Sequence, residues 1–357
     1  MYKNKVFVGL ALLAIGALLP SSINAQPQNI GISLPNVSPR AETTQVVGLT
    51  EIDVSYHRPA VNDREIWGAL VAYDQVWRAG ANENTLISFS SDVTIEGQHL
   101  TTGTYGLHMI PGESEWQVIF SKDTTAWGSF SYNEEADALR VSVKPQEDEF
   151  EERLSYSFED LANESATLNL RWEKLRLPVK IEVDTEAVSV ASIRNQLKGL
   201  SQFFWTGWNQ GATYCLQNDI NLEEALQWAD NSIQAEERFE NLSTKAQILE
   251  KTGDPEQSAE IMARALEIGN AGQLHQYGRN LLGQGDTEQA MEIFQRNAQQ
   301  NPDAWFIGFG LARGYSALGE FNKAAENMKA SLDAAPDGQK AYVQGMIDKL
   351  EKNEDIN

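Results

Sequence analysis

Seven side chains in the first half of the chain combine the charges and rings that a binding or catalytic site needs. They are His57, Arg58, Trp77, Arg78, Asn82, Glu83 and His108. An arginine and a carboxylate beside an aromatic ring could hold a glycan, a peptide terminus or an acidic substrate. The alternative is a buried arginine–carboxylate network that fixes the long connection from Arg58 to Asn84. These residue types leave both readings open.

Enzymatic chemistry is a second hypothesis for the same residues. A hydrolase acting on a glycan or a peptide could use Arg78 and Glu83 together with His57 or His108. Glu83 could also pair with Glu173 or Asp137 for glycoside hydrolysis, but a chain with 51 acidic residues always offers such pairs. No Gly-x-Ser-x-Gly nucleophile motif occurs. The sequence therefore favours a non-enzymatic binding or scaffold protein.

Metal binding is a third hypothesis, because His57, His99 and His108 could together supply three imidazoles to zinc. The spacing counts against it, since His99 and His108 converge only if the hairpin between them is tightly paired. Isolated histidines on strands or turns are more often hydrogen-bonded structural groups. We therefore predict no metal site and no cofactor.

The segments that must position these residues have an apolar period of two. Apolar residues alternate with polar ones in residues 52–56, 85–89, 116–120 and 168–172. This alternation is typical of half-buried strands. Many short strands without helices between them predict an all-β antiparallel sandwich or barrel-like domain over residues 26–185.

The apolar period becomes helical after that domain, and a repeat appears. Gly253, Gly285 and Gly319 lie 32 and 34 residues apart, and Ala290 and Ala324 each follow their glycine by five residues. This spacing resembles the tetratricopeptide repeat, a pair of helices that small residues allow to approach closely. It predicts an all-α tetratricopeptide-like solenoid over residues 186–357 that binds a protein or peptide.

An aromatic cluster begins the helical domain with Phe203, Phe204, Trp205 and Trp208. Large aromatic side chains are usually buried, so we expect the cluster to pack the first helix onto the β domain or the next helix. The alternative is an exposed apolar patch, which would mark an interface with a partner.

Residues 1–25 predict a secretory signal peptide. Lys3 and Lys5 precede an apolar run from Val6 to Leu19, and Ile23-Asn24-Ala25 provides a small-residue cleavage site. We expect an exported protein, periplasmic or extracellular, with no stable membrane insertion once the signal is removed.

The charge balance excludes one class of partner. The formal net charge is −23 at pH 7, whereas nucleic-acid binding needs clustered Lys and Arg to displace counterions. The single cysteine, Cys215, excludes an intramolecular disulfide. Stability must then come from packed cores, and a chain of this length can build two.

Motifs along the first domain resemble those of a bacterial family called the domain of unknown function 2911. They include Tyr56-His57-Arg58-Pro59, Ile66-Trp67-Gly68, the run from Val76 to Glu83, Gly103-Thr104-Tyr105 and Leu170-Arg171-Trp172-Glu173. The resemblance covers roughly residues 34–183 and follows the family's order of motifs. It implies an exported protein, often with helical repeats attached, and it implies no known activity.

Overall fold

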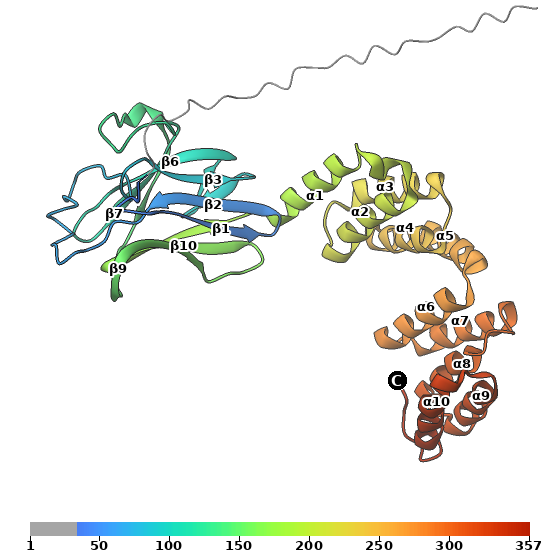
Figure 1. The fold of residues 1–357 in the computed structure, drawn as a ribbon. Helices are drawn as coiled ribbons and strands as arrows, with labels where there is room; N and C mark the ends of the chain where they lie inside the picture. Colours follow the sequence, from blue (N-terminus) through green and yellow to red (C-terminus); the bar gives the residue numbers. More distant parts are fainter. Residues whose placement is uncertain (1–33) are drawn as a thin grey trace, which may run out of the picture.

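A computed structural model describes residues 34–357 as a β domain followed by a helical domain (Figure 1). The predicted signal peptide, residues 1–25, lies outside the described residues. Within residues 34–357, no helix has both the length and the apolar composition that a membrane span requires.

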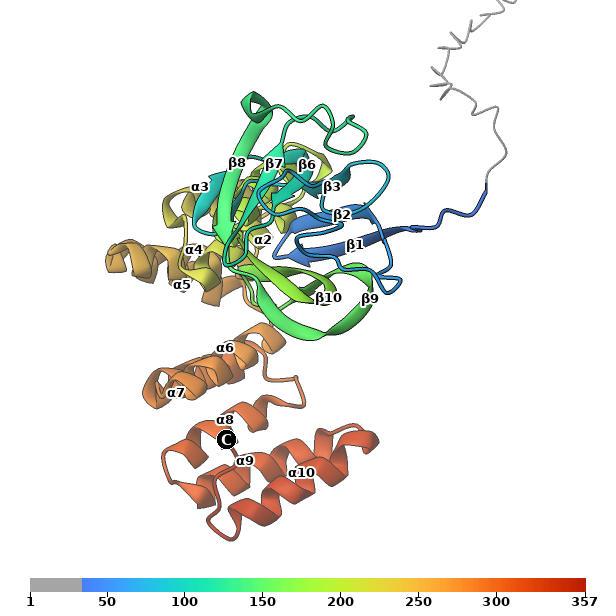
Figure 2. The same ribbon diagram turned by 90° about the vertical axis from the view of Figure 1, so that its left-hand side faces the viewer.

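The β domain consists of two antiparallel sheets that pack face to face. One sheet has six strands in the order β1 (Arg40–Val47), β2 (Thr50–His57), β3 (Thr85–Phe89), β6 (Gly103–Ile110), β7 (Trp116–Ser121) and β8 (Asp137–Val143). The other has four in the order β5 (Gln98–Leu100), β4 (Val93–Ile95), β10 (Ser165–Glu182) and β9 (Gln146–Glu159). Figures 1 and 2 show β9 and β10 as a layer against β1 and β2. The predicted antiparallel sandwich is confirmed, and neither of these sheets closes into a barrel.

Alternation along the strands builds the core between the two sheets. On β2, Ile52 and Val54 are fully buried, whereas the intervening Asp53 is partly exposed. The largest buried side chains include Trp116 from the six-stranded sheet and Trp172 from the other. Each large apolar side chain stabilises the fold by about 1.5–3 kcal/mol when fully buried. The core therefore joins the two sheets into one folded unit.

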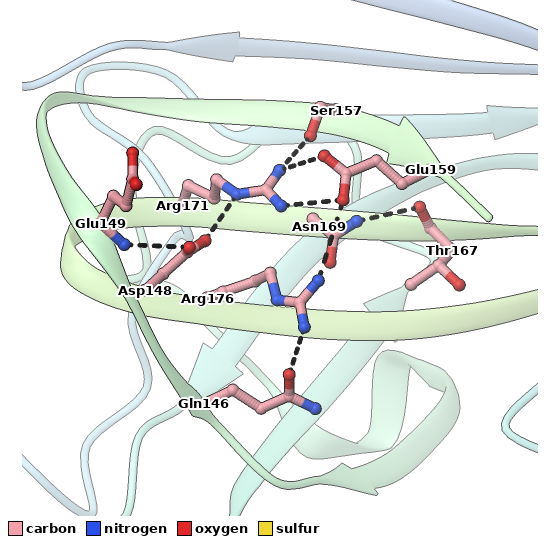
Figure 3. Close-up of polar contacts among 9 residues, drawn as sticks. All are labelled: Gln146, Asp148, Glu149, Ser157, Glu159, Thr167, Asn169, Arg171 and Arg176. Carbon is pink, nitrogen blue, oxygen red and sulfur yellow. Dashed lines mark hydrogen bonds and ion pairs between the residues drawn. The ribbon is translucent and has the colours of Figure 1, made fainter.

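Strand β10 is folded back on itself. The Val183 amide donates to the Glu164 carbonyl oxygen at 2.8 Å, although an extended chain of this length would span about 60 Å. Glu173 has a positive φ of 57°, and the register with β9 shifts on both sides of it. A positive φ is unfavourable for a residue with a side chain, so the surrounding contacts must hold this bend (Figure 3).

Ten α-helices form the rest of the described chain. They are α1 (Thr185–Gln196), α2 (Trp205–Asn218), α3 (Leu222–Ala235), α4 (Phe239–Thr252), α5 (Pro255–Ile268), α6 (Ala271–Gln284), α7 (Thr287–Gln300), α8 (Ile307–Ala317), α9 (Phe321–Ala334) and α10 (Asp337–Leu350). Figure 1 shows the pairs from α2 to α9 stacked one after another, with α10 last. The helical half of the fold is thus the predicted tetratricopeptide-like solenoid.

The repeated glycines and alanines explain the helix pairs. Gly253, Gly285 and Gly319 each follow the first helix of a pair and have φ values of 89°, 90° and 75°, a conformation that glycine adopts without strain. Ala290 and Ala324, on the second helices, are completely buried. The spacing of the repeat therefore predicted both the turns and the close contacts between helices.

Candidate functional site

The connection between β2 and β3, residues 58–84, places its tryptophans in the core. Trp67 packs edge-on against Trp116, with ring centroids 5.0 Å apart, and Trp77 stacks on Trp172 at 6.0 Å. The indole Nε1 of Trp77 donates to the Gly80 carbonyl oxygen at 3.2 Å. Trp77, predicted as a ligand-binding residue, thus contributes to the packing that closes this end of the sandwich.

Two further predicted residues anchor the same connection. Arg58 Nε donates to the Leu154 carbonyl oxygen at 2.8 Å, and its guanidinium lies 3.8 Å from Glu151. Asn82 Nδ2 donates to the Ser38 carbonyl oxygen at 3.2 Å. Both side chains fasten residues 58–84 to neighbouring segments, which agrees with the network alternative for this part of the set.

His57 and Glu83 form a contact at the end of β2. The Nδ1 of His57 lies 3.3 Å from Glu83 Oε2, with the imidazole buried and the carboxylate 62% exposed. Arg78 is absent from this contact. The structure thus pairs Glu83 with His57 and places Arg78 against the ring of Trp127.

Polar residues form a row across the outer face of the six-stranded sheet. Leu86 on β3 pairs with Ser55 on β2 and with Gly106 on β6. Two residues away from this row, His57 follows Ser55, Asn84 precedes Leu86 and His108 follows Gly106. The same face therefore carries His57, Asn84 and His108 side by side. Alternation thus brings two of the predicted residues, His57 and His108, onto one face, with Asn84 between them. Sequence reasoning missed Asn84, although it directly follows the run from Val76 to Glu83.

His108 is held beneath residues 122–133, the loop that follows β7. It is only 2% exposed, and its Nδ1 lies 3.0 Å from Ser129 Oγ. Burial lowers the pKa of His108, although the carboxylates of Asp137 and Asp123 act in the opposite direction. The imidazole is therefore neutral at pH 7 and can donate or accept a hydrogen bond.

Arg78 contacts the same loop. Its Cζ lies 5.7 Å from the ring centroid of Trp127, a distance at which a cation is attracted to an aromatic face. Burial lowers the pKa of Arg78, and no carboxylate of residues 34–357 acts against that effect. Arg78 and His108 are thus brought together through the loop, whereas Arg58, Trp77 and Asn82 are not part of this group.

A different arginine cluster on β9 and β10 was not predicted as a site. Arg171 donates to both carboxylate oxygens of Glu159 at 2.7 and 2.8 Å, to Asp148 at 2.7 Å and to Ser157 at 2.6 Å (Figure 3). These hydrogen bonds from Arg171 lower the pKa of both carboxyls. Arg176 adds contacts with Glu159 and Gln146. The cluster joins both halves of the folded β10 to β9 and acts as a clamp on the bend.

The remaining candidate histidine and one candidate acid have partners of their own. Within residues 34–357, no group of three or more His, Cys, Asp or Glu side chains could hold a metal ion. His99 lies on β5, in the other sheet from His57 and His108, 3.7 Å from Asp92. The Asp137 carboxylate, one candidate acid, accepts hydrogen bonds from Tyr132 and Arg140.

The aromatic cluster at the start of the helical domain differs from the prediction. Phe203 and Phe204 are 71% and 61% exposed, whereas Trp208 is half-buried and donates from Nε1 to the Gln202 carbonyl oxygen at 2.8 Å. A short 3-10 helix, η2 (Leu200–Phe203), separates α1 from α2. This tight turn directs both phenylalanines away from the core, so the prediction that they pack there is wrong.

The helical domain holds an extended segment against α8. The Arg313 guanidinium donates to the Ile356 carbonyl oxygen at 2.8 Å, and Ser316 Oγ donates to Asp355 Oδ1 at 2.6 Å. The Ile356 amide donates in turn to Ser316 Oγ at 3.2 Å. The Ile356 side chain is 7% exposed and packs in the apolar cluster between α8 and α10 that includes Val343. Residues 353–357 are thus bound through main chain, carboxylate and apolar side chain together.

The fold and these sites define an antiparallel β-sandwich joined to helix-pair repeats. Residues 38–181 match the family model described as "Protein of unknown function (DUF2911)". This match covers most of the β domain and confirms the resemblance that its motifs predicted. Among curated proteins, none matches the chain with significant similarity.

Solved structures similar to the helical region are tetratricopeptide repeat (TPR) proteins. YrrB, described as a TPR protein with an unusual peptide-binding site, is 18% identical with a TM-score of 0.28, over 45% of this chain and 83% of that chain. Pseudomonas aeruginosa PilF is 19% identical with a TM-score of 0.30, over 42% and 68%. Desulfovibrio magneticus MamA is 17% identical with a TM-score of 0.26, over 44% and 98%. The assignment of the helix pairs rests on the repeat within this chain.

Proposed function

We propose that this is an exported binding protein, periplasmic or extracellular, whose helical repeats bind an extended acidic segment of a partner protein. The observation that carries the proposal is the seating of residues 353–357 against α8. Export is supported by the signal-peptide pattern of residues 1–25.

The contacts of this segment indicate what the surface recognises. Arg313 and Ser316 bond the main chain of Ile356, so a segment of different sequence can use the same two contacts. The buried Ile356 side chain and the Asp355 carboxylate add a preference for an acidic residue followed by an apolar one. A partner would therefore present an extended acidic–apolar motif.

The charges beside the segment favour the same partner. His275 and Arg279 on α6 lie close enough to Arg313 on α8 for their charges to interact. Burial, with the charges of Arg279 and Arg313, lowers the pKa of His275 to about 4, so this histidine is neutral at pH 7. Two arginines with like charge side by side attract an anionic ligand, even though the whole chain is strongly acidic.

The test uses the chain's own segment as the probe. A fluorescent peptide of residues 350–357 is titrated into the intact chain and into a chain ending at Lys352, and its anisotropy is measured. We expect binding to the shortened chain and at least tenfold weaker binding to the intact chain, because residues 353–357 already occupy the surface. Circular dichroism checks that the shortened chain keeps its helices.

A matched pair of arginine variants places the binding site. In the shortened chain, Arg313→Ala should weaken peptide binding at least tenfold, whereas Arg296→Ala on α7, a second helix of a pair, should leave it unchanged. Absence of peptide binding to a folded shortened chain would refute the proposal. Equal loss with both variants would place the site elsewhere.

A further inference from the structure

Two buried polar atoms beside the loop of residues 122–133 have no hydrogen-bond partner in the described chain. They are Oδ1 of Asn84 and Nε of Arg78. Asn84 is 7% exposed, and its Nδ2 reaches only the Asp123 carbonyl oxygen, at 3.4 Å. Buried polar groups in folded proteins are almost always hydrogen-bonded, because an unpaired one loses its water without compensation. An acceptor and a charged donor left unpaired in one region indicate a missing partner.

The polar groups of this region converge on Gly106. A Cβ atom at Gly106 would lie 3.1 Å from Asn84 Nδ2, 3.5 Å from His108 Nε2 and 2.4 Å from the Asp123 carbonyl oxygen. Only a residue without a side chain lets these three groups approach one point. Residues 122–133 therefore pack directly on the sheet at Gly106, over the side chains of Asn84 and His108.

The covering loop connects this part of the sheet to Arg78. Ser129 contacts His108, and the neighbouring Gly128 has a φ of 70°, with Arg78 Nη1 3.0 Å from the position that a Cβ would occupy there. Two consecutive loop residues thus touch the imidazole and the guanidinium. A molecule that displaced this loop would meet Arg78, Asn84 and His108 together.

Exposed aromatic rings stand on the same loop. Trp127 is 59% exposed and Phe130 is 83% exposed, and their rings stack with centroids 6.0 Å apart. Arg78 lies against the Trp127 ring. A flat apolar ring next to hydrogen-bonding groups suits ligands that have one apolar face and a polar edge. A sugar ring has this character.

We infer that this face of the β domain binds a carboxylate-bearing sugar, such as a uronic acid. The sugar carboxylate pairs with Arg78, a hydroxyl donates to Asn84 Oδ1, and the ring lies on Trp127. His108 offers its free Nε2 to a second hydroxyl. Since Asn84 is buried, binding requires residues 122–133 to shift away from Gly106. This site is independent of the α8 surface of the helical domain.

A purely structural role predicts a different pattern of partners. In the Arg171 cluster of the same domain, hydrogen bonds from Nε, Nη1 and Nη2 reach Asp148, Ser157 and Glu159. Arg78 Nε has no such partner, and its guanidinium faces an exposed ring. Within one domain, Arg171 therefore stabilises the fold, whereas Arg78 is available to bind a ligand.

The experiment is calorimetric titration of the full chain with D-glucuronate, compared with D-glucose and with acetate. We expect glucuronate to bind at least tenfold more tightly than either, because only glucuronate offers both carboxylate and ring. A peptide with a free terminal carboxylate serves as a further arm. Binding of the peptide without binding of glucuronate would overturn the sugar assignment, and binding of none of the four would overturn the site.

Variants assign the binding to these residues. Arg78→Met and Trp127→Ala should each weaken glucuronate binding at least tenfold, whereas Arg40→Met, an exposed arginine on β1, should have no effect. Trp127 is largely exposed, so its variant remains informative even if Arg78→Met folds poorly. Unchanged affinity in Trp127→Ala would refute the inference. Glucuronate binding should also persist in the chain ending at Lys352, whatever becomes of the peptide site.

Discussion

Arg171 and Arg78 lie in one β domain and differ in what surrounds them. Arg171 donates hydrogen bonds to Glu159, Asp148 and Ser157, whereas Arg78 has a buried Nε without a partner in the described chain and lies against the face of Trp127. A residue whose hydrogen bonds are satisfied within the chain stabilises the fold. A residue left unpaired lowers stability unless something else binds it.

The largest expected effect is therefore the loss of Arg171. Arg171→Met removes the hydrogen-bonded cation of Asp148 and Glu159 at the bend of β10 and leaves them only the more distant charge of Arg176. It should cost about 2–4 kcal/mol of unfolding free energy, somewhat below the range for fully buried pairs. Arg78→Met should change that free energy by less than about 1 kcal/mol, since no partner is orphaned. Urea denaturation of both variants measures the difference. Equal destabilisation would remove the distinction between the two arginines.

The helical domain permits the same contrast on one helix. Ala290 is completely buried and Glu288 is exposed, both on α7. Ala290→Leu should overpack the helix pair and cost about 1–3 kcal/mol, whereas Glu288→Leu should stay within about 0.5 kcal/mol of the parent. Thermal melting followed by circular dichroism compares them. A neutral Ala290→Leu would contradict the close approach of these helices.

Gly106→Ala tests whether the loop that covers the Arg78 region can move away from the sheet. Its Cβ would meet the Asp123 carbonyl oxygen at 2.4 Å, so either the sheet or residues 122–133 must move. If the loop can lift from the sheet, the cost should be small, about 1 kcal/mol, and limited proteolysis should cut residues 122–133 faster than in the parent. A large loss of stability with unchanged proteolysis would show a loop that cannot open.

The smallest effect is the pH dependence of stability that the Arg171 cluster contributes. Arg171 lowers the folded-state pKa of Asp148 and Glu159, so the unfolded chain binds more protons in acid. The resulting stability is present above about pH 4, the ordinary range of these carboxyls, and is lost as the pH falls through the folded-state values. The destabilisation by Arg171→Met should accordingly shrink between pH 6 and pH 2.5 in urea titrations. If the difference in unfolding free energy between Arg171→Met and the parent did not change with pH, the role of the Arg171 cluster as a clamp would be contradicted.

Local patterns predicted the parts of the molecule that local forces determine. Alternation identified β2, because the face of the strand that carries Ile52 and Val54 must be buried. The spacing of Gly253, Gly285 and Gly319 identified the turns of the repeat. These features depend on residues close in sequence. The fold class followed from them.

Long-range packing determined what the sequence could not predict. The bend of β10 depends on Val183 meeting Glu164 and on Arg171 meeting Asp148, contacts that no periodicity encodes. Phe203 and Phe204 look like core residues by type, but a short turn exposes them. Asn84 shares a row with His108 only because β3 and β6 are adjacent. Residue type indicated candidates for the site, and sheet order decided which of them meet.

Any ligand that binds this surface of α8 must compete with residues 353–357, which already occupy it. A segment joined to its own binding surface by a short tether competes at an effective concentration in the range of about millimolar. A free peptide with the same contacts would therefore remain largely excluded at the micromolar concentrations common for proteins. A partner that reaches further, for example toward Arg279, would gain additional contacts and could displace the segment. On the proposed function, the tether thus selects for extended partners and keeps short acidic peptides out.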